Sequence, residues 1–252
     1  MDLQRCHSAL ETRKSFPSLR RLSLTSCQPG ISLFLRRLSS LAELTDIEVS
    51  DELCEGDGVE DVGRVTEFFQ VVRGCGRLES LAIRITGSDE QDSHSDPLPV
   101  AVLEPLRSCS LLKSLFIELV WAFHIDDTDL VTLLQHLPRL IHFKLEVVTP
   151  LTHRPSLSLQ ALAIFTTLCP KIQTINIAVD ASRSTAQEMV YYPTRLELID
   201  VQHSYIEDSV AVAAFLSWLP ASRALEVRYR NVGDKLSEEW EKVRGTLQLR
   251  VV

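Results

Sequence analysis

The chain has 252 residues, of which 45% are hydrophobic, and its formal net charge at pH 7 is −8. This length and apolar content suffice for a large hydrophobic core, whereas the acidic balance argues against a general nucleic-acid-binding protein. No apolar run reaches the roughly 18 residues that a membrane-spanning helix needs, and residues 1–15 lack the apolar segment of a secretory signal peptide.

A repeated pattern, L-x-x-L-x-L, organises the chain from residue 16 onward. Clear copies are FPSLRRLSL (Phe16–Leu24), GRLESLAI (Gly76–Ile83) and CPKIQTINI (Cys169–Ile177). Eight copies align, with a mean spacing of about 29 residues, which lies in the leucine-rich-repeat range, where each unit holds a strand and a helix. The first positions of the eight copies are Leu19, Leu44, Leu78, Leu112, Leu140, Ile172, Leu196 and, in a degraded copy, Ser222.

Each copy predicts a β-strand with one apolar face and one polar face. The fourth and sixth positions are apolar in all eight copies. Because they are two residues apart, their side chains leave the same face of a strand. The third, fifth and seventh positions leave the other face and are mostly polar, as Arg21, Ser23 and Thr25 are in the first copy. One face of the predicted sheet therefore lies in the core, and the other faces solvent.

Between the strands the apolar residues change to helical spacing. Acidic residues such as Asp126 and Asp127 stand where a helix would begin and are N-cap candidates. A proline follows several of these segments and ends the helix, because it lacks the N–H that a continuing helix needs. The expected helices are Glu60–Cys75, Asp126–Leu137, Ser156–Cys169 and Tyr205–Leu219, and Asp234–Val252 is expected to form a helix followed by a last apolar strand, TLQLRVV.

Strands that alternate with helices at this period predict a right-handed α/β leucine-rich-repeat solenoid. Its strands would form one parallel sheet on the concave face, and its helices would cover the convex face. The alternative, an ordinary doubly wound α/β domain, does not repeat a leucine register. We expect residues 1–15 to be a lead-in, either the end of a preceding repeat or disordered. Residues 16–252 would then form the repeat domain, with about eight repeats plus the terminal helix and strand.

Three cysteines occupy equivalent places in the repeat. Cys75, Cys109 and Cys169 each lie three residues before the first position of a copy, where Leu41 and Leu137 stand in other copies. We predict that these cysteines are small buried apolar residues rather than metal ligands. Since the chain contains no C-x-x-C pair, the sequence indicates a reduced protein of the cytoplasm or nucleus.

The common catalytic motifs are absent from the sequence. It contains no phosphate-binding G-x-x-x-x-G-K-[ST], no H-E-x-x-H and no G-x-S-x-G. His124, Asp126 and Asp127 could be read as a metal cluster, but the two aspartates also fit the first turn of the expected helix. We therefore expect a protein that is not an enzyme and that uses no metal or other cofactor.

Two regions are candidate binding surfaces for a protein partner. An aromatic residue at an outward strand position, such as Phe116, is typical of an interface anchor, although it could instead cover the aliphatic parts of its neighbours. The outward residues near the middle of the array are Arg84, Phe116, Glu118, His142, Lys144 and Glu146.

The second region is the segment Asp46–Asp61, which holds eight acidic residues and no basic one. We expect it to form a loop on one rim of the solenoid. Such a rim either only keeps the protein soluble or steers a basic partner through Asp51, Glu52, Asp57 and Asp61.

The copies CGRLESLAI, CSLLKSLFI and LCPKIQTINI, with cysteine or proline just ahead of the strand, resemble the repeats of F-box leucine-rich-repeat proteins. They are most similar to the divergent fungal members, and the resemblance covers about residues 16–230. In that family an F-box binds the adaptor of a cullin ubiquitin ligase, and the repeats hold the protein to be ubiquitinated. The residues ahead of the first copy are too few for an F-box, so the resemblance implies contact with the adaptor only if an upstream F-box exists.

The resemblance implies a non-catalytic protein-interaction module that recognises substrates for such a ligase. The alternative is a free-standing leucine-rich-repeat protein that regulates or inhibits another enzyme. Because no polar cap precedes the first copy, we also expect the isolated chain to be marginally stable or to self-associate through its N-terminal end.

Overall fold

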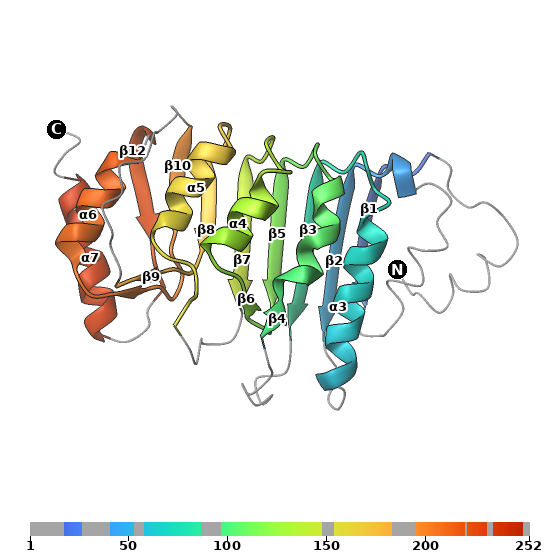
Figure 1. Cartoon of the computed structure of the whole chain (residues 1–252), viewed down its shortest axis with the longest axis horizontal. Coiled ribbons are helices and arrows are strands. Elements are labelled where there is room, and N and C mark those ends of the chain that lie inside the picture. Colours follow the sequence, from blue (N-terminus) through green and yellow to red (C-terminus); the bar gives the residue numbers. More distant parts are fainter. Residues whose placement is uncertain are drawn as a thin grey trace, which may run out of the picture.

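A computed structural model describes residues 18–26, 41–52, 58–86, 97–147, 154–182, 195–219, 221–230 and 234–248. Its main feature is one eight-stranded sheet with the strand order β1-β2-β3-β5-β7-β8-β10-β12, in which all neighbours are parallel (Figure 1). The predicted α/β fold with a parallel sheet is thus confirmed. The strands are β1 (Arg21–Ser26), β2 (Asp46–Glu52), β3 (Ser80–Thr86), β5 (Ser114–Leu119), β7 (His142–Val147), β8 (Thr174–Ile177), β10 (Leu196–Asp200) and β12 (Ala221–Arg228).

Each of the eight sequence copies contributes one strand of this sheet. In the first seven copies the fourth motif positions lie opposite one another across the strands, so Ile47 pairs with Leu22 and Leu81. The eighth copy is the exception, because Val227 rather than Leu225 lies opposite Ile199. Its first position is irregular as well, because Ala221 rather than Ser222 lies opposite Leu196, the first position of the seventh copy. From Glu226 onward the shift is by two residues, after an irregular pairing between Leu196 and Leu198, so the side chains there keep the same faces.

The turn into each strand repeats along the chain. The N–H of Leu78 donates to the Cys75 carbonyl (3.0 Å), and the N–H of Leu112 donates to the Cys109 carbonyl (2.9 Å). A second contact links neighbouring units, because the Glu79 carbonyl accepts the N–H groups of both Lys113 (2.7 Å) and Ser114 (3.1 Å). These bonds satisfy the backbone where a helix gives way to a strand, and they tie each unit to the next.

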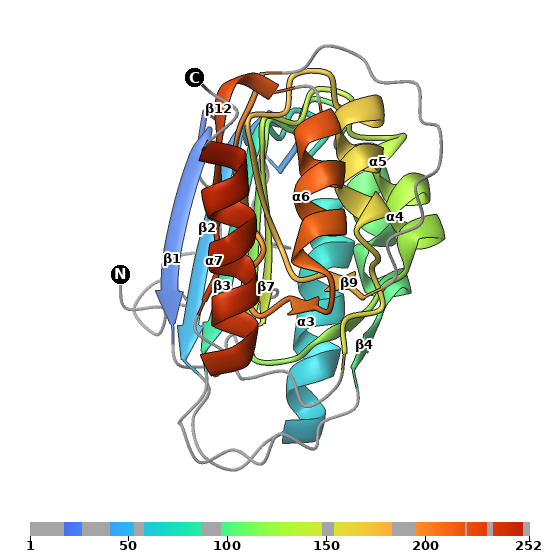
Figure 2. The same ribbon diagram turned by 90° about the vertical axis from the view of Figure 1, so that its left-hand side faces the viewer.

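The helices α3 to α6 lie on one face of the sheet, as the end-on view shows (Figure 2). The last helix, α7, lies beside α6 at the β12 end (Figure 1). There the Trp240 side chain is buried, and its Nε1–H donates to the Ser204 carbonyl (3.1 Å). The helices are η1 (Leu41–Glu43), α3 (Gly58–Val72), η2 (Val100–Ser108), α4 (Asp127–Leu134), α5 (Gln160–Leu168), α6 (Ser209–Trp218) and α7 (Asp234–Gln248).

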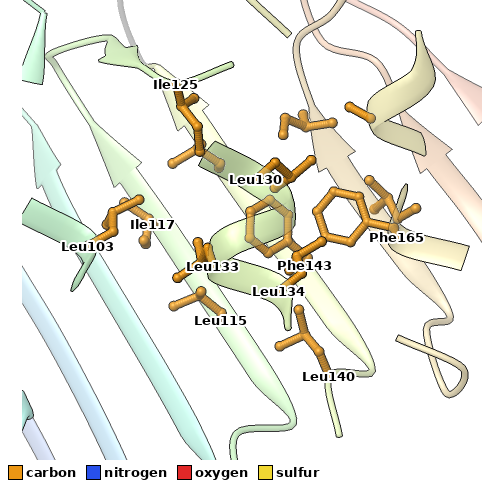
Figure 3. Close-up of a cluster of buried hydrophobic side chains, with 14 of the residues drawn as sticks. Leu103, Leu115, Ile117, Ile125, Leu130, Leu133, Leu134, Leu140, Phe143 and Phe165 are labelled. Carbon is orange, nitrogen blue, oxygen red and sulfur yellow. The ribbon is translucent and has the colours of Figure 1, made fainter. Parts of the chain in front are cut away.

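The hydrophobic core fills the space between the sheet and these helices. The Phe143 ring from β7 packs against the Phe165 ring from α5, with 4.6 Å between the centroids (Figure 3). Leu115 and Ile117 from β5 meet the same layer, and both side chains are fully buried. Two small parallel sheets, β4 (Leu98–Pro99) with β6 (Phe123–His124) and β9 (Asp180–Ala181) with β11 (Tyr205–Ile206), complete the secondary structure that the described residues form.

Cys75, Cys109 and Cys169 are fully buried free thiols, as predicted from their places in the repeat. The Sγ of Cys169 donates to the Leu137 carbonyl of the preceding unit (3.6 Å). Burial raises the pKa of the Cys169 thiol to about 12, and burial together with the neighbouring Cys109 raises that of Cys75 to about 12. These side chains therefore stay protonated and act as small packing groups.

All four internal helices begin or end elsewhere than predicted; α3 spans Gly58–Val72, and α4 ends at Leu134 rather than at Leu137. Asp126 caps α4 as expected, because its carboxylate accepts the Asp129 N–H (2.9 Å). Helix α5 begins at Gln160 rather than at Ser156, since the N–H of Ser158 donates to the Asp127 carboxylate (3.0 Å) and holds that segment outside the helix. Helix α6 begins only after Asp208, whose carboxylate caps it, so the predicted start at Tyr205 is wrong.

The predicted final strand is also wrong as far as the structure reaches. Helix α7 runs to Gln248, and the Thr246 hydroxyl donates to the Lys242 carbonyl one turn earlier (2.8 Å). Residues 249–252 lie outside the described part of the chain. Of the apolar residues that suggested a strand, Leu247 lies within this helix and packs against the core, as does the preceding Val243, which is buried.

None of the helices within the described ranges combines the length and the apolar character that a membrane span requires.

Helix η2 was not predicted from the sequence. Pro105 lies inside η2 and removes one backbone donor, which is consistent with a 3₁₀-helix in place of a longer α-helix.

Candidate functional site

The face of the sheet opposite α3 to α6 is the candidate binding surface, and we call it the open face. It is formed by the third, fifth and seventh positions of each copy, and no helix of the described residues lies over its centre (Figure 2). From β2 to β12 its residues are Asp46, Glu48, Ser50, Ser80, Ala82, Arg84, Ser114, Phe116, Glu118, His142, Lys144, Glu146, Thr174, Asn176, Leu198, Asp200, Glu226 and Arg228.

All six residues predicted for the central patch lie together on this face. Glu118 of β5 is opposite Arg84 of β3 on one side and Glu146 of β7 on the other. Phe116 lies opposite Lys144. The sequence register therefore placed these side chains correctly, because alternation along a strand fixes the face and the parallel pairing fixes the neighbours.

A chain of ion pairs links the charged members of the patch. Arg84 Nε lies 3.2 Å from Glu118 Oε1. Lys144 Nζ lies 2.9 Å from Glu118 Oε2 and 2.7 Å from Glu146 Oε2, so it bridges the two carboxylates. Two carboxylates directly opposite each other would repel, and the shared ammonium group removes that repulsion.

Glu146 is the buried centre of this chain, with only 4% of its surface exposed. Its second carboxylate oxygen forms an ion pair with Arg230, which follows β12. Burial disfavours the charged carboxylate, but hydrogen bonds and attraction from Lys144 and Arg230 outweigh it, so the pKa of Glu146 is lowered. For Lys144, burial disfavours the charged form, and Glu146 and Glu118 outweigh it, so the pKa of Lys144 is raised. Both groups are thus charged at neutral pH.

Phe116 and His142 form the apolar part of the patch. Phe116 is 36% exposed, and its ring lies stacked with the His142 ring, with 6.5 Å between centroids and 29° between planes. The His142 Nδ1 is 3.0 Å from the Thr174 hydroxyl on β8, which orients the imidazole. The stacked pair presents a fixed apolar surface beside the ion pairs.

Four further residues extend the patch and were not predicted from the sequence: Arg230, Gln202, Asn176 and Asp200. Gln202 is buried, and its Nε2 donates to the Leu145 carbonyl (2.7 Å) and to Asn176 Oδ1. The Asn176 amide donates in turn to Asp200 (3.1 Å). Asn176 and Asp200 were recognisable as outward strand positions, whereas Gln202 and Arg230 follow the ends of their strands.

Gln202 has φ = 49°, the left-handed region that side chains other than glycine adopt at a cost. Its backbone is held there by two bonds, because its N–H donates to Asp200 (2.9 Å) and its carbonyl accepts the Arg230 N–H (2.8 Å). The turn at Gln202 therefore bonds to the backbone of Arg230, whose side chain pairs with Glu146.

The predicted acidic rim is not one loop. The segment from Asp46 to Glu52 forms β2, because Ile47 and Val49 alternate with acidic residues and enter the core. Asp51 lies opposite the buried Ile85, on the face that the core residues use, and it is half-buried. Asp61 lies within α3 rather than in a loop, because that helix begins at Gly58.

The other members of the acidic rim fall partly or wholly outside the described residues. Asp57 lies wholly outside the described residues, and the side chains of Glu52 and Asp61 lie outside them too. On the open face of β2, Asp46 pairs with Arg21 (3.4 Å) and Glu48 accepts the Ser23 hydroxyl (3.2 Å). The described acids on this part of the open face are thus engaged by β1.

The chemistry of the open face suits recognition. Within the described ranges, no three histidine, cysteine or carboxylate side chains are grouped so that they could hold a metal ion. Asp126 is the N-cap of α4, and His124 lies on β6. What the open face offers is a rigid array of charges around one exposed aromatic ring.

Comparison of the chain with models of protein families finds no matching family, and comparison with curated proteins finds no match.

Proposed function

We propose that the chain is a right-handed leucine-rich-repeat solenoid whose open face is concave and whose helices form the convex side. The one-to-one relation between sequence copies and strands supports this proposal, as does the recurring turn before each strand. In such an array each unit buries its leucines against both neighbours, so the sheet grows by repetition and offers an extended surface to partners.

We infer that the function is non-catalytic binding of another protein by this face. The observation that carries the inference is Phe116, an exposed ring held beside His142 and surrounded by ion pairs. An aromatic group fixed in place loses little conformational entropy on binding and is the usual centre of a protein interface. The ion pairs around it would set the orientation of the partner.

The role we propose is recognition of a protein to be ubiquitinated, as in F-box leucine-rich-repeat subunits of cullin ligases. An F-box would supply the contact with the ligase adaptor, so the proposal for this chain concerns the bound substrate. A reduced compartment, the cytoplasm or nucleus, is part of the same proposal, since Cys75, Cys109 and Cys169 are free thiols.

The test is affinity capture from an extract of the source cells with three baits: the unaltered chain, Phe116→Ala and Trp218→Ala. Trp218 is the matched control, because it is 71% exposed but lies on α6, on the helix side. We expect a partner that the unaltered chain and Trp218→Ala retain and that Phe116→Ala loses, with binding weakened about tenfold or more.

Retention of the same partner by Phe116→Ala, or its loss from Trp218→Ala alone, would contradict the proposed face. The identity of the captured protein separates the two roles. A partner whose ubiquitination depends on this chain supports the ligase role, whereas an enzyme whose activity changes on binding supports a regulator.

A further inference from the structure

We propose that the segment docked on the open face is an acidic peptide, with a carboxylate that pairs with Arg84 and an apolar side chain that packs on Phe116 and His142. This inference rests on the proposed protein-binding function and names the chemistry of the partner. It also differs from the basic partner expected from the acidic segment Asp46–Asp61.

The accessible charge of the central ion-pair chain is positive. Three cations, Arg84, Lys144 and Arg230, neutralise two carboxylates. The carboxylates lie underneath, since only 18% of the Glu118 side chain and 5% of the Glu146 side chain is exposed. The guanidinium groups lie above them, with 59% of the Arg84 side chain and 39% of the Arg230 side chain exposed. An approaching chain therefore meets arginine first.

Arg84 retains the means to hold a second carboxylate. Its contact with Glu118 is made by Nε at 3.2 Å, whereas a guanidinium group has five N–H donors in a planar fork. The fork fits a carboxylate through two parallel hydrogen bonds. Glu118 orients the arginine from below and leaves its outer edge toward solvent.

Further carboxylates lie on other strands of the open face, among them Glu48 of β2 and Asp200 of β10, but neither of these lies opposite Arg84, whose neighbours in the register are Ser50 and Glu118. Asp200 accepts hydrogen bonds from the Asn176 amide and the Gln202 N–H, and Glu226 pairs with Arg228 (2.6 Å). Burial and the nearby Arg230 lower the pKa of His203, so its imidazole is neutral at pH 7. On β3 itself the other outward residues, Ser80 and Ala82, are uncharged.

The spacing of the two contacts defines the peptide. Arg84 is opposite Glu118, and Glu118 is two residues beyond Phe116 on β5. With strands about 4.8 Å apart and a rise of about 3.3 Å per residue, the Arg84 and Phe116 backbone positions are roughly 8 Å apart. Side chains two residues apart on an extended peptide are about 7 Å apart on one face. The expected motif is an aromatic or aliphatic residue two positions from Asp or Glu.

The test is selection of a random linear peptide library on the purified chain, followed by binding measurements on Phe116→Ala, Arg84→Glu and Arg139→Glu. Arg139 is the matched control, because it is exposed in the turn between α4 and β7. We expect the selected peptides to carry an acidic residue two positions from an apolar one. Arg84→Glu should weaken their binding at least about tenfold, which is the effect of losing one strong charged contact, whereas Arg139→Glu should not.

Enrichment of basic or uncharged peptides whose binding still requires Phe116 would overturn the acidic-peptide inference and leave the binding face in place. Failure to obtain any peptide whose binding depends on Phe116 would overturn both. The Arg84 variant is suited to this test, because an exposed arginine can be reversed without opening the core, whereas Arg230 neutralises the buried Glu146.

Discussion

Replacing Phe143 with alanine is expected to lower the free energy of unfolding by about 3–5 kcal/mol. The ring is 2% exposed and lies at the centre of the core, against Phe165 of α5 (Figure 3). Truncation removes buried apolar surface and leaves a cavity that the surrounding strands and helices cannot fully close. Denaturant unfolding should show a lower midpoint with an unchanged slope.

Phe116→Ala is the matched control for this change. The two phenylalanines lie on the adjacent strands β5 and β7, but their side chains leave opposite faces of the sheet. Because Phe116 is exposed, its truncation is expected to change the free energy of unfolding by no more than about 0.5–1 kcal/mol. Equal losses in the two variants would mean that the faces of the sheet have been assigned wrongly.

Glu146→Gln is expected to cost about 3 kcal/mol of folding free energy, the low end of the range for breaking a buried ion pair. The substitution keeps the size of the side chain but leaves Arg230 without its carboxylate and Lys144 with Glu118 alone. The low end applies because both cations are partly exposed and can gain some hydration. The measurement is again denaturant unfolding, at neutral pH and low salt.

The pH dependence of the free energy of unfolding tests the contribution of Glu146 independently. The pKa of Glu146 is lower in the folded protein than in the unfolded chain, where a glutamate titrates near about 4.3. Its contribution is therefore present above that pH and is lost as the pH falls through the folded-state pKa. In Glu146→Gln the free energy of unfolding, measured by denaturant unfolding at neutral and acid pH, should fall less between the two than it does in the unaltered chain.

Glu226→Gln is the control for Glu146→Gln, because its ion pair with Arg228 is exposed on both sides. It should leave the stability essentially unchanged. If the two variants unfolded at the same denaturant concentration, the buried ion-pair chain would not contribute as described.

Face and neighbour relations could be predicted from the sequence because they follow from short periods. Two apolar residues two positions apart fix the buried face of a strand, as Leu115 and Ile117 do in β5. The parallel pairing of consecutive copies then places Arg84, Glu118 and Glu146 on neighbouring strands in one row. The predicted central patch followed from these two regularities alone.

Features that depend on a few local bonds or on distant partners could not be predicted. The start of α6 is set by the Asp208 cap, while the apolar pattern had suggested an earlier start. The pairing of Arg230 with Glu146 joins residues far apart in sequence, and the backbone N–H of Arg230 bonds to the carbonyl of Gln202, which lies in a left-handed turn. The two-residue shift in the eighth copy left the side-chain pattern intact, so the pattern did not reveal it.

The most direct test of the proposed binding face is hydroxyl-radical footprinting of the chain alone and in complex with its captured partner. Phe116 and Trp218 serve as paired reporters, since both are exposed but lie on opposite sides of the molecule. We expect partner binding to reduce the oxidation of Phe116 and to leave that of Trp218 unchanged. Protection of Trp218 with Phe116 still fully reactive would contradict the account, because the partner would then dock on the helices and not on the open face.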